Sequence, residues 1–128
     1  MENAVTEGKQ KILIVEDNPD IRLYLEVILT KAGFEVLQAA NGAKAMDIAW
    51  NCIPDLIITD AMMPVLDGFG MIQALKREAT FSRIPIIMMT GSSDSMPSEG
   101  AGQPEEYIRK PFTAGDILAR IEKLLPKA

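Results

Sequence analysis

The most informative stretch of the chain is PDLIITDAMMPVLDG, residues 54–68. Its segment Leu56–Thr59 is short, apolar and rich in β-branched residues, which predicts a buried strand. Asp60 follows this strand directly, at a point where neither the sheet nor a helix requires an acid. Asp60 is therefore either a turn residue or a reagent, and residues elsewhere in the chain have to distinguish these two interpretations.

Apolar, β-rich segments of the same kind recur and alternate with helical patterns. The expected strands are Ile12–Val15, Phe34–Ala39, Leu56–Thr59, Ile84–Met89 and Tyr107–Ile108. The expected helices are Pro19–Ala32, one capped by Asn41 that stops before Pro54, one capped by Asp67, and one opened by the capping-box pair Thr113 and Asp116. This alternation predicts an α/β fold with a doubly wound, five-stranded parallel sheet.

The segment Gly91–Pro104 interrupts the alternation where a fourth helix is expected. Nine of its fourteen residues are Gly, Ser or Pro, and Pro97 prevents regular helical hydrogen bonding in its middle. The segment predicts an atypical or degenerate fourth helix. Our hypothesis is a mobile, irregular loop, and the alternative is a distorted short helix without a special role.

Composition and charge exclude several classes of protein. The length of 128 residues suits one domain, and we expect a flexible tail over residues 1–10 and a domain over residues 11–126. No apolar run approaches the roughly 18 residues of a membrane span, and the start lacks the layout of a secretory signal. We therefore expect a cytoplasmic protein without membrane contact. The net charge of -5 opposes direct nucleic-acid binding.

The chain has no histidine and one cysteine, which restricts its chemistry. The absence of histidine removes His-based metal sites and the Ser–His and Cys–His nucleophile pairs. Cys52 has no partner for an intrachain disulfide, and its place on the apolar face of the second helical pattern predicts packing rather than reactivity. Any chemistry must use carboxylates, Thr, Lys and the backbone.

Polar residues follow four of the five expected strands. Glu16 and Asp17 follow the first, Asp60 the third, Thr90 the fourth and Lys110 the fifth. Read alone, each has an ordinary explanation, as a helix cap, a turn or a strand stop. In a parallel sheet, however, the carboxyl ends of the strands share one edge, where ligands bind. The sequence therefore predicts that these five side chains converge.

Three converging carboxylates repel one another unless a positive charge lies among them. An oxygen-only cluster without His or Cys suits Mg²⁺, which binds through one or two carboxylates together with phosphate oxygens. Mg²⁺ and Lys110 together suit a phosphoryl group, and Asp60 is then the natural nucleophile, because carboxylates form aspartyl-phosphate intermediates. Lys110 and the Thr90 hydroxyl would contact the remaining phosphoryl oxygens.

Four blocks of the sequence, ILIVEDNPD, PDLIITDAMMPVLDG, MMTG and YIRKPF, resemble the signature blocks of two-component response-regulator receiver domains. The resemblance covers about residues 11–125. It implies the flavodoxin-like, CheY-like strand order 2-1-3-4-5, in a single-domain or excised receiver. It also implies phosphorylation of Asp60 by a sensor histidine kinase or a histidine phosphotransfer protein.

The same resemblance implies a role for each site residue. Receiver domains hold Mg²⁺ with residues matching Asp17, Asp60 and the backbone carbonyl of Met62, and Glu16 matches a member of the acidic pocket. The switch and phosphoryl-binding positions match Thr90, Tyr107 and Lys110. Our hypothesis for Gly91–Pro104 is then that this loop couples the state of the switch to partner binding. The Lys110–Pro111 bond is expected to be cis, which proline permits at low cost.

Three functional hypotheses follow from these patterns. The first is a phosphorylation-dependent switch that changes contacts with a downstream protein target and catalyses only its own phosphorylation and slow dephosphorylation. The second is a receiver-like interaction module that never uses Asp60 chemistry, and the third is a hydrolase built on an aspartyl-phosphate. The complete set of acids, Thr90 and Lys110 opposes the second, and the lack of a visible dedicated base, substrate pocket or lid weakens the third.

Overall fold

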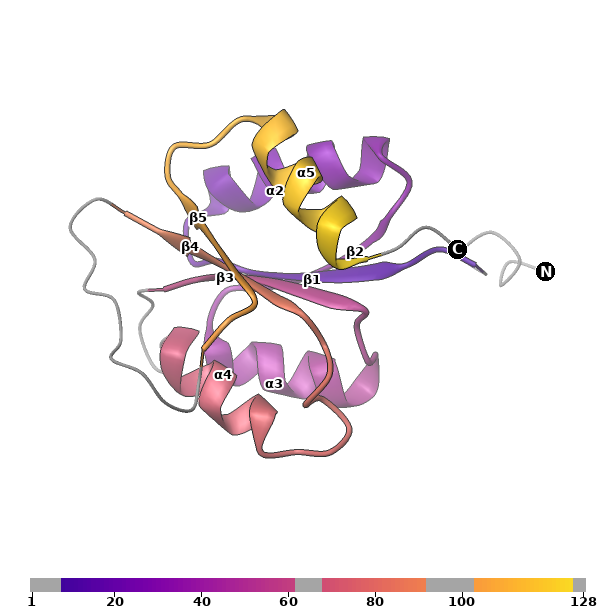
Figure 1. Cartoon of the computed structure of the whole chain (residues 1–128), viewed down its shortest axis with the longest axis vertical. Helices are drawn as coiled ribbons and strands as arrows, with labels where there is room; N and C mark the ends of the chain where they lie inside the picture. The colour runs from indigo at the N-terminus through magenta and orange to yellow at the C-terminus, as the bar shows by residue number, and fades with distance from the viewer. Residues whose placement is uncertain (1–7, 62–67, 92–102, 126–128) are drawn as a thin grey trace.

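The computed structural model describes residues 8–61, 68–91 and 103–125 (Figure 1). Several sequence-based predictions fall outside these ranges. They are the Met62 carbonyl as a metal ligand, the Asp67 cap, most of the tail over residues 1–10 and most of the segment Gly91–Pro104. These remain predictions.

The described chain alternates strands and helices as predicted. The elements are β1 (Lys11–Val15), α2 (Pro19–Lys31), β2 (Glu35–Ala39), α3 (Gly42–Asn51), β3 (Leu56–Asp60), α4 (Gly68–Lys76), β4 (Ile86–Thr90), β5 (Glu106–Arg109) and α5 (Ala114–Leu124). The strands form one sheet in the order β2-β1-β3-β4-β5, and every adjacent pair is parallel. The doubly wound fold and its strand order are confirmed.

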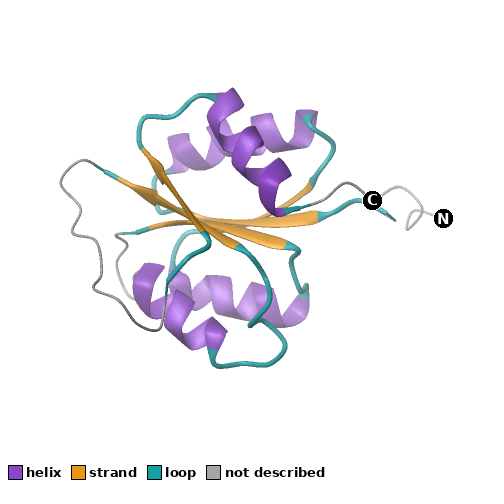
Figure 2. Cartoon of the chain, in the orientation of Figure 1, coloured by secondary structure: helices purple, strands orange, loops and turns teal. Residues whose placement is uncertain are grey.

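The three inner strands are buried because helices cover the sheet on both faces. Helices α2 and α5 lie on one face, and α3 and α4 lie on the other (Figures 1 and 2). Alternate residues of one strand therefore enter different cores: Leu13 packs toward α3 and α4, while Ile12 and Ile14 pack toward α2 and α5. Burial on both faces explains why the sequences of β1 and β3 consist mainly of consecutive apolar residues.

The strand limits differ from the sequence prediction by one or two residues. Strand β3 includes Asp60, because its ladder with β4 continues to the pair Asp60–Met89. Strand β4 begins at Ile86 rather than Ile84. The reason is that the Ile84 amide donates to the Phe81 carbonyl in the preceding turn, so Ile84 precedes the strand.

Polar side chains cap three of the described helices. Asn18 caps α2, since its Oδ1 accepts from the amides of Asp20 at 2.8 Å and Ile21 at 3.3 Å. Asn41 caps α3, as predicted. At α5 the Thr113 hydroxyl and the Asp116 carboxylate form the predicted reciprocal capping box.

Cys52 does not pack in the core, contrary to the prediction from its helical spacing. The residue is exposed and forms the C-cap of α3, with φ -138° and ψ 76°. Because the backbone leaves the helical conformation at this position, the side chain no longer continues the face of Ala45 and Ala49, which are both buried. The helical spacing in the sequence therefore continues one residue beyond the end of α3 at Asn51.

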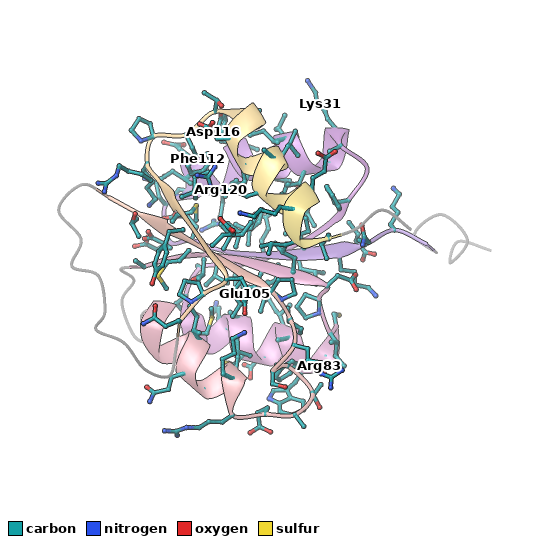
Figure 3. All side chains as sticks on the ribbon, viewed as in Figure 1. Lys31, Arg83, Glu105, Phe112, Asp116 and Arg120 are labelled. Carbon is teal, nitrogen blue, oxygen red and sulfur yellow. The ribbon has the colours of Figure 1, made fainter. Side chains whose placement is uncertain are left out.

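Strand β5 lies at one edge of the sheet and is tied to both neighbouring helices by side chains. Arg120, on α5, donates from Nε to the Tyr107 carbonyl at 3.1 Å, and Figure 3 shows Arg120 near this strand. At the start of β5, the Glu105 carboxylate accepts from the Ile86 amide and from Lys76 Nζ, both at 2.8 Å. These contacts fix the strand that leads to Lys110.

We expect Thr113→Ala to lower the free energy of unfolding by about 1 kcal/mol, because it removes the N-cap acceptor of α5. Urea unfolding followed by circular dichroism measures this change. Thr30→Ala is the matched control, since Thr30 is exposed and lies near the C-terminal end of α2. Equal stability of the Thr113 and Thr30 variants would contradict a stabilising cap.

Candidate functional site

The site lies where the order of the strands reverses. From β1 the chain passes to β2 on one side of β1, and β3 lies on the other side. The carboxyl ends of β1 and β3 therefore flank the crevice in which open α/β sheets bind ligands. Glu16 and Asp17 follow β1 directly, and Asp60 is the last residue of β3.

Lys110 lies between two buried carboxylates from different strands. Its Nζ is 2.9 Å from Asp60 Oδ1 and 3.2 Å from Glu16 Oε1. Glu16 is 1% exposed and Asp60 is 7% exposed. An ammonium in this position compensates charges that would otherwise be buried without a partner. The predicted convergence of these three side chains is present in the structure.

Glu16, Asp17 and Asp60 form one acidic cluster. Each offers a carboxylate oxygen, and the three oxygens lie within 4.8 Å of one another. Oxygen ligands alone, with part of the cluster open to solvent at the exposed Asp17, are the donor set that suits Mg²⁺. The residues therefore fit a divalent cation, which would relieve the repulsion that Lys110 alone leaves between three acids.

Burial makes these carboxylates harder to ionise. Desolvation raises the pKa of Asp60 above its usual range, although the hydrogen bond from Lys110 acts against this effect. Desolvation also raises the pKa of Glu16, with a further contribution from the charge of Asp60. For Lys110 burial acts to lower the pKa, but the hydrogen bond to Asp60 and the charges of Glu16 and Asp60 outweigh it and raise the pKa. Lys110 is accordingly charged at neutral pH.

Thr90 and Tyr107, the two predicted switch residues, lie on the neighbouring strands β4 and β5. Thr90 ends β4 and is 5% exposed, and its carbonyl accepts from the Lys110 amide at 2.7 Å. Tyr107 is half-buried, and its hydroxyl donates to Gln103 Oε1 at 2.9 Å. Burial raises the pKa of Tyr107. The structure connects Thr90 to Lys110 through the backbone, and the switching of both residues stays a prediction.

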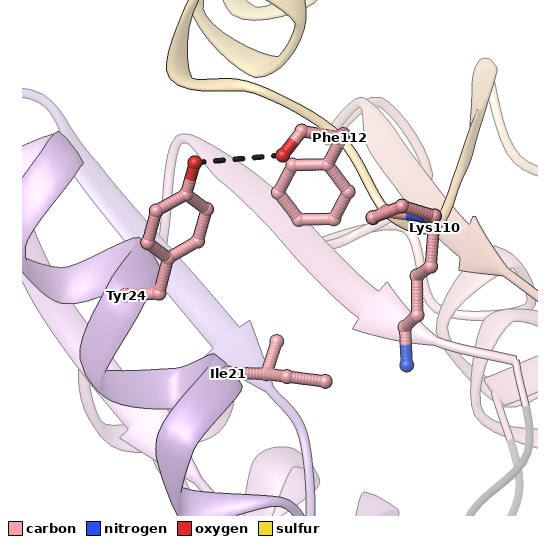
Figure 4. A pocket seen from close by; sticks show the side chains of 5 residues that line it. Ile21, Tyr24, Lys110 and Phe112 are labelled. Atoms are coloured by element: carbon pink, nitrogen blue, oxygen red, sulfur yellow. Dashed lines mark hydrogen bonds between the residues drawn. The ribbon is translucent and has the colours of Figure 1, made fainter.

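A cavity of about 340 Å³ lies beside the site, between α2 and the segment that follows β5 (Figure 4). It is lined by Ile21, Tyr24, Lys110, Pro111 and Phe112. The Tyr24 hydroxyl donates to the Phe112 carbonyl at 3.4 Å. The Lys110–Pro111 bond is cis, as expected. The sequence carries no signal for this cavity, because Tyr24 and Phe112 are 88 residues apart and carry no shared motif.

Arg22 is a further residue that the sequence did not indicate. Its NH1 donates to the Glu16 carbonyl at 2.8 Å, within the segment that carries two of the three clustered acids. Read in sequence, Arg22 is one polar position on an amphipathic helix. Its i+6 relation to Glu16 is not a recognised pairing, so only the folded geometry shows the contact.

Comparison with known proteins agrees with this geometry. A family model described as the response regulator receiver domain matches residues 12–122. The chain therefore belongs to the receiver-domain family of two-component response regulators. None of the helices in the described part of the chain is long and apolar enough to cross a membrane.

A curated relative and two solved structures illustrate the relationship. The probable transcriptional regulator ycf27 of Porphyra purpurea is 41% identical over 123 residues, covering 94% of this chain and 49% of the relative. Chemotaxis response regulator CheY4 of Vibrio cholerae is 30% identical, with a TM-score of 0.82 and coverage of 91% of this chain and 99% of that one. The receiver domain of sensor histidine kinase PA1611 from Pseudomonas aeruginosa PAO1 is 29% identical, with a TM-score of 0.82 and coverage of 91% and 97%.

Two features of these proteins bear on the site and on the extent of the chain. The PA1611 receiver structure has a magnesium ion coordinated in its active-site cleft. The present chain spans about half the length of the ycf27 relative, which is described as a transcriptional regulator.

Without a divalent cation, we expect Asp60→Asn to raise the free energy of unfolding at pH 7. The raised pKa of Asp60 means that the folded state binds a proton there more tightly than the unfolded chain. The contribution of the Asp60 carboxyl group to the free energy of unfolding is complete below the ordinary carboxyl pKa. It is lost as the pH rises through the raised pKa of the folded state. Urea unfolding in a chelator at pH 7 and at lower pH measures the gain, which shrinks as the solution is acidified.

Asp47→Asn is the control for this prediction, because Asp47 is an exposed acid in the middle of α3. This variant should change the stability little at either pH. An Asp60→Asn protein that is less stable than the parent in chelator would contradict the view that burial makes the Asp60 carboxylate costly to ionise.

Proposed function

We propose that this chain is a phosphorylation-dependent signalling switch in which Asp60 accepts a phosphoryl group from a sensor histidine kinase or a histidine phosphotransfer protein. The observation that carries the proposal is the arrangement of Asp60, Glu16 and Lys110, with the Lys110 ammonium within 3.2 Å of both carboxylates. Membership of the receiver-domain family supports it.

In the proposed reaction a carboxylate oxygen of Asp60 attacks the phosphorus atom. The new bond is an acyl phosphate P–O bond, the P–N bond of the donor phosphohistidine breaks, and the leaving imidazole takes up a proton. Lys110, which already contacts Asp60 Oδ1 at 2.9 Å, would stabilise negative charge on a phosphoryl oxygen. The reaction therefore uses a nucleophile and a cation that the fold brings into contact before the donor binds.

Glu16, Asp17 and Asp60 are the described residues that would hold Mg²⁺, and Met62 would add its backbone carbonyl. When bound, Mg²⁺ would supply positive charge that compensates these acids and stabilises the charge of the phosphoryl group. Asp17 is exposed, which leaves the cluster accessible from solvent, while Glu16 is buried and tied to Lys110. We therefore propose that Asp17 is the acid that a cation reaches first.

Thr90 and Tyr107 would convert the phosphorylation of Asp60 into a change at the protein surface. A phosphoryl group adds charge and acceptor oxygens, toward which the Thr90 hydroxyl can turn. Tyr107 lies on the adjacent strand, with its hydroxyl bonded to Gln103, so a change at Thr90 can alter the surface around β5. In this proposal the output is a changed contact with a downstream protein target, and the chain catalyses only its own phosphorylation and slow dephosphorylation.

We further propose that these residues act in the cytoplasm, without membrane contact and without touching nucleic acid themselves. The net charge of -5 opposes contact with a phosphate backbone. The similarity to a transcriptional regulator is compatible with this view, because this chain spans only about half of that relative.

The covalent step is tested by incubating the parent and Asp60→Asn with Mg²⁺ and a small phosphodonor such as acetyl phosphate, followed by intact-mass measurement. We expect the parent alone to gain one phosphoryl group, and hydroxylamine to remove it. No adduct on the parent with any small donor or phosphohistidine donor would overturn the proposal in favour of an interaction module. Sustained turnover of a phosphorylated substrate would instead indicate a hydrolase.

Lys110→Ala should slow adduct formation by roughly 10- to 100-fold at saturating Mg²⁺, because it removes a cation aimed at the developing phosphoryl charge. The initial rate of the mass gain measures this loss. Lys123→Ala is the matched control: Lys123 also forms an ion pair, with Glu106, but its side chain is 67% exposed. An unchanged rate in the Lys110 variant would contradict the role assigned to this residue.

A further inference from the structure

The segment that joins β1 to α2 consists of three residues and carries two of the three clustered acids. These residues are Glu16, Asp17 and Asn18. The segment is short and closely held: the Glu16 amide donates to the Ala39 carbonyl at 3.0 Å, and the Asn18 amide donates to Glu16 Oε2 at 3.1 Å. Asn18 also caps α2, which fixes the far end of the segment.

Arg22 makes the contact that fixes the middle of this segment. It lies in the first turns of α2, and its NH1 donates to the Glu16 carbonyl at 2.8 Å. The Arg22 amide also donates to the Asn18 carbonyl at 3.0 Å, so the residue that holds the Glu16 carbonyl is itself part of the capped helix. A hydrogen bond from a guanidinium is charge-assisted and stronger than one between neutral groups.

The Glu16 carbonyl belongs to the peptide group that joins Glu16 to Asp17. A peptide group is planar, so fixing its oxygen fixes the plane and the direction in which the chain enters Asp17. The carboxylate of Asp17 depends on this direction, because the residue is exposed and has less packing around it than the buried Glu16. Arg22 thus acts on Asp17 through the backbone.

The contact of Arg22 with this segment is a contact with its backbone, because NH1 donates to the Glu16 carbonyl. The carboxylates of Glu16 and Asp60 are instead contacted by the Lys110 ammonium. We therefore assign a geometric effect to Arg22 and the compensation of charge to Lys110.

We propose that Arg22 is a positioning residue of the cation site: by holding the Glu16–Asp17 peptide, it places the Asp17 carboxylate where a divalent cation binds together with Asp60. The effect of Arg22 on phosphoryl transfer rests on the proposed function. The cation affinity that this inference predicts can be measured without any phosphoryl transfer.

The test uses Mn²⁺ as the probe, with binding followed by electron paramagnetic resonance of the free ion. We expect Arg22→Met to raise the Kd for Mn²⁺ roughly tenfold, which is the usual effect of losing a group that orients a ligand. Arg22→Lys should recover part of the affinity, since it keeps a charged donor on a long stem. Arg83→Met, at an exposed arginine between α4 and β4, should leave the Kd unchanged.

The Mg²⁺ dependence of adduct formation gives a second readout. Arg22→Met should raise the Mg²⁺ concentration for half-maximal rate roughly tenfold and leave the rate at saturating Mg²⁺ within about twofold of the parent. A merely structural role would lower the saturated rate or the amount of folded protein instead. If Arg22→Met does not fold, Arg22→Gln replaces it, because glutamine is polar but too short to make the same contact.

The outcomes separate the two proposals. An unchanged Kd for Mn²⁺ in a folded Met or Gln variant would overturn the role of Arg22, even if the parent is phosphorylated normally. A lower rate at saturating Mg²⁺ with an unchanged Kd would overturn it as well. If the parent binds Mn²⁺ but never forms an adduct, the proposed function fails, whereas a weaker Kd in the variants still supports the positioning role.

Discussion

The contact between the Lys110 ammonium and the carboxylates of Asp60 and Glu16 is the interaction on which the site depends. It joins the carboxyl ends of β1, β3 and β5, so it exists only when the whole sheet has formed. Two acids that are almost fully buried could not remain ionised beside each other without it. The acidic cluster still lacks positive charge, because it holds three acids and Lys110 contacts two of them. A divalent cation would supply the missing charge.

The sheet topology explains why these residues meet although 94 positions separate Glu16 from Lys110. All the strands are parallel, so each delivers the residue that follows it to the same edge, and the reversal of strand order between β1 and β3 opens that edge for a ligand. The two apolar layers, under α2 with α5 and under α3 with α4, hold the strands in register. The chemistry is local, but the positions of its groups are a property of the complete fold.

Much of this could be predicted from the sequence, because strand and helix patterns here are local and regular. Asp60 was identified as the candidate reagent by the polar residues at the other strand ends, and the structure brings Glu16, Asp17 and Lys110 around it. The failures have physical causes. Cys52 was misplaced because periodicity does not show where a helix ends, and Arg22 was missed because its partner is a backbone carbonyl, which has no sequence signal.

The ladder contact of Asp60 has a mechanical consequence. Asp60 pairs with Met89 across the sheet, and the next amide, of Ala61, donates to the Met89 carbonyl at 3.0 Å. The backbone of Asp60 is therefore held in the hydrogen-bonded ladder between β3 and β4. If Asp60 accepts a phosphoryl group as proposed, this ladder resists movement of its backbone. The resulting displacement is then expected in the side chains and connections that face Asp60, and a signal would leave the site through them rather than through the sheet.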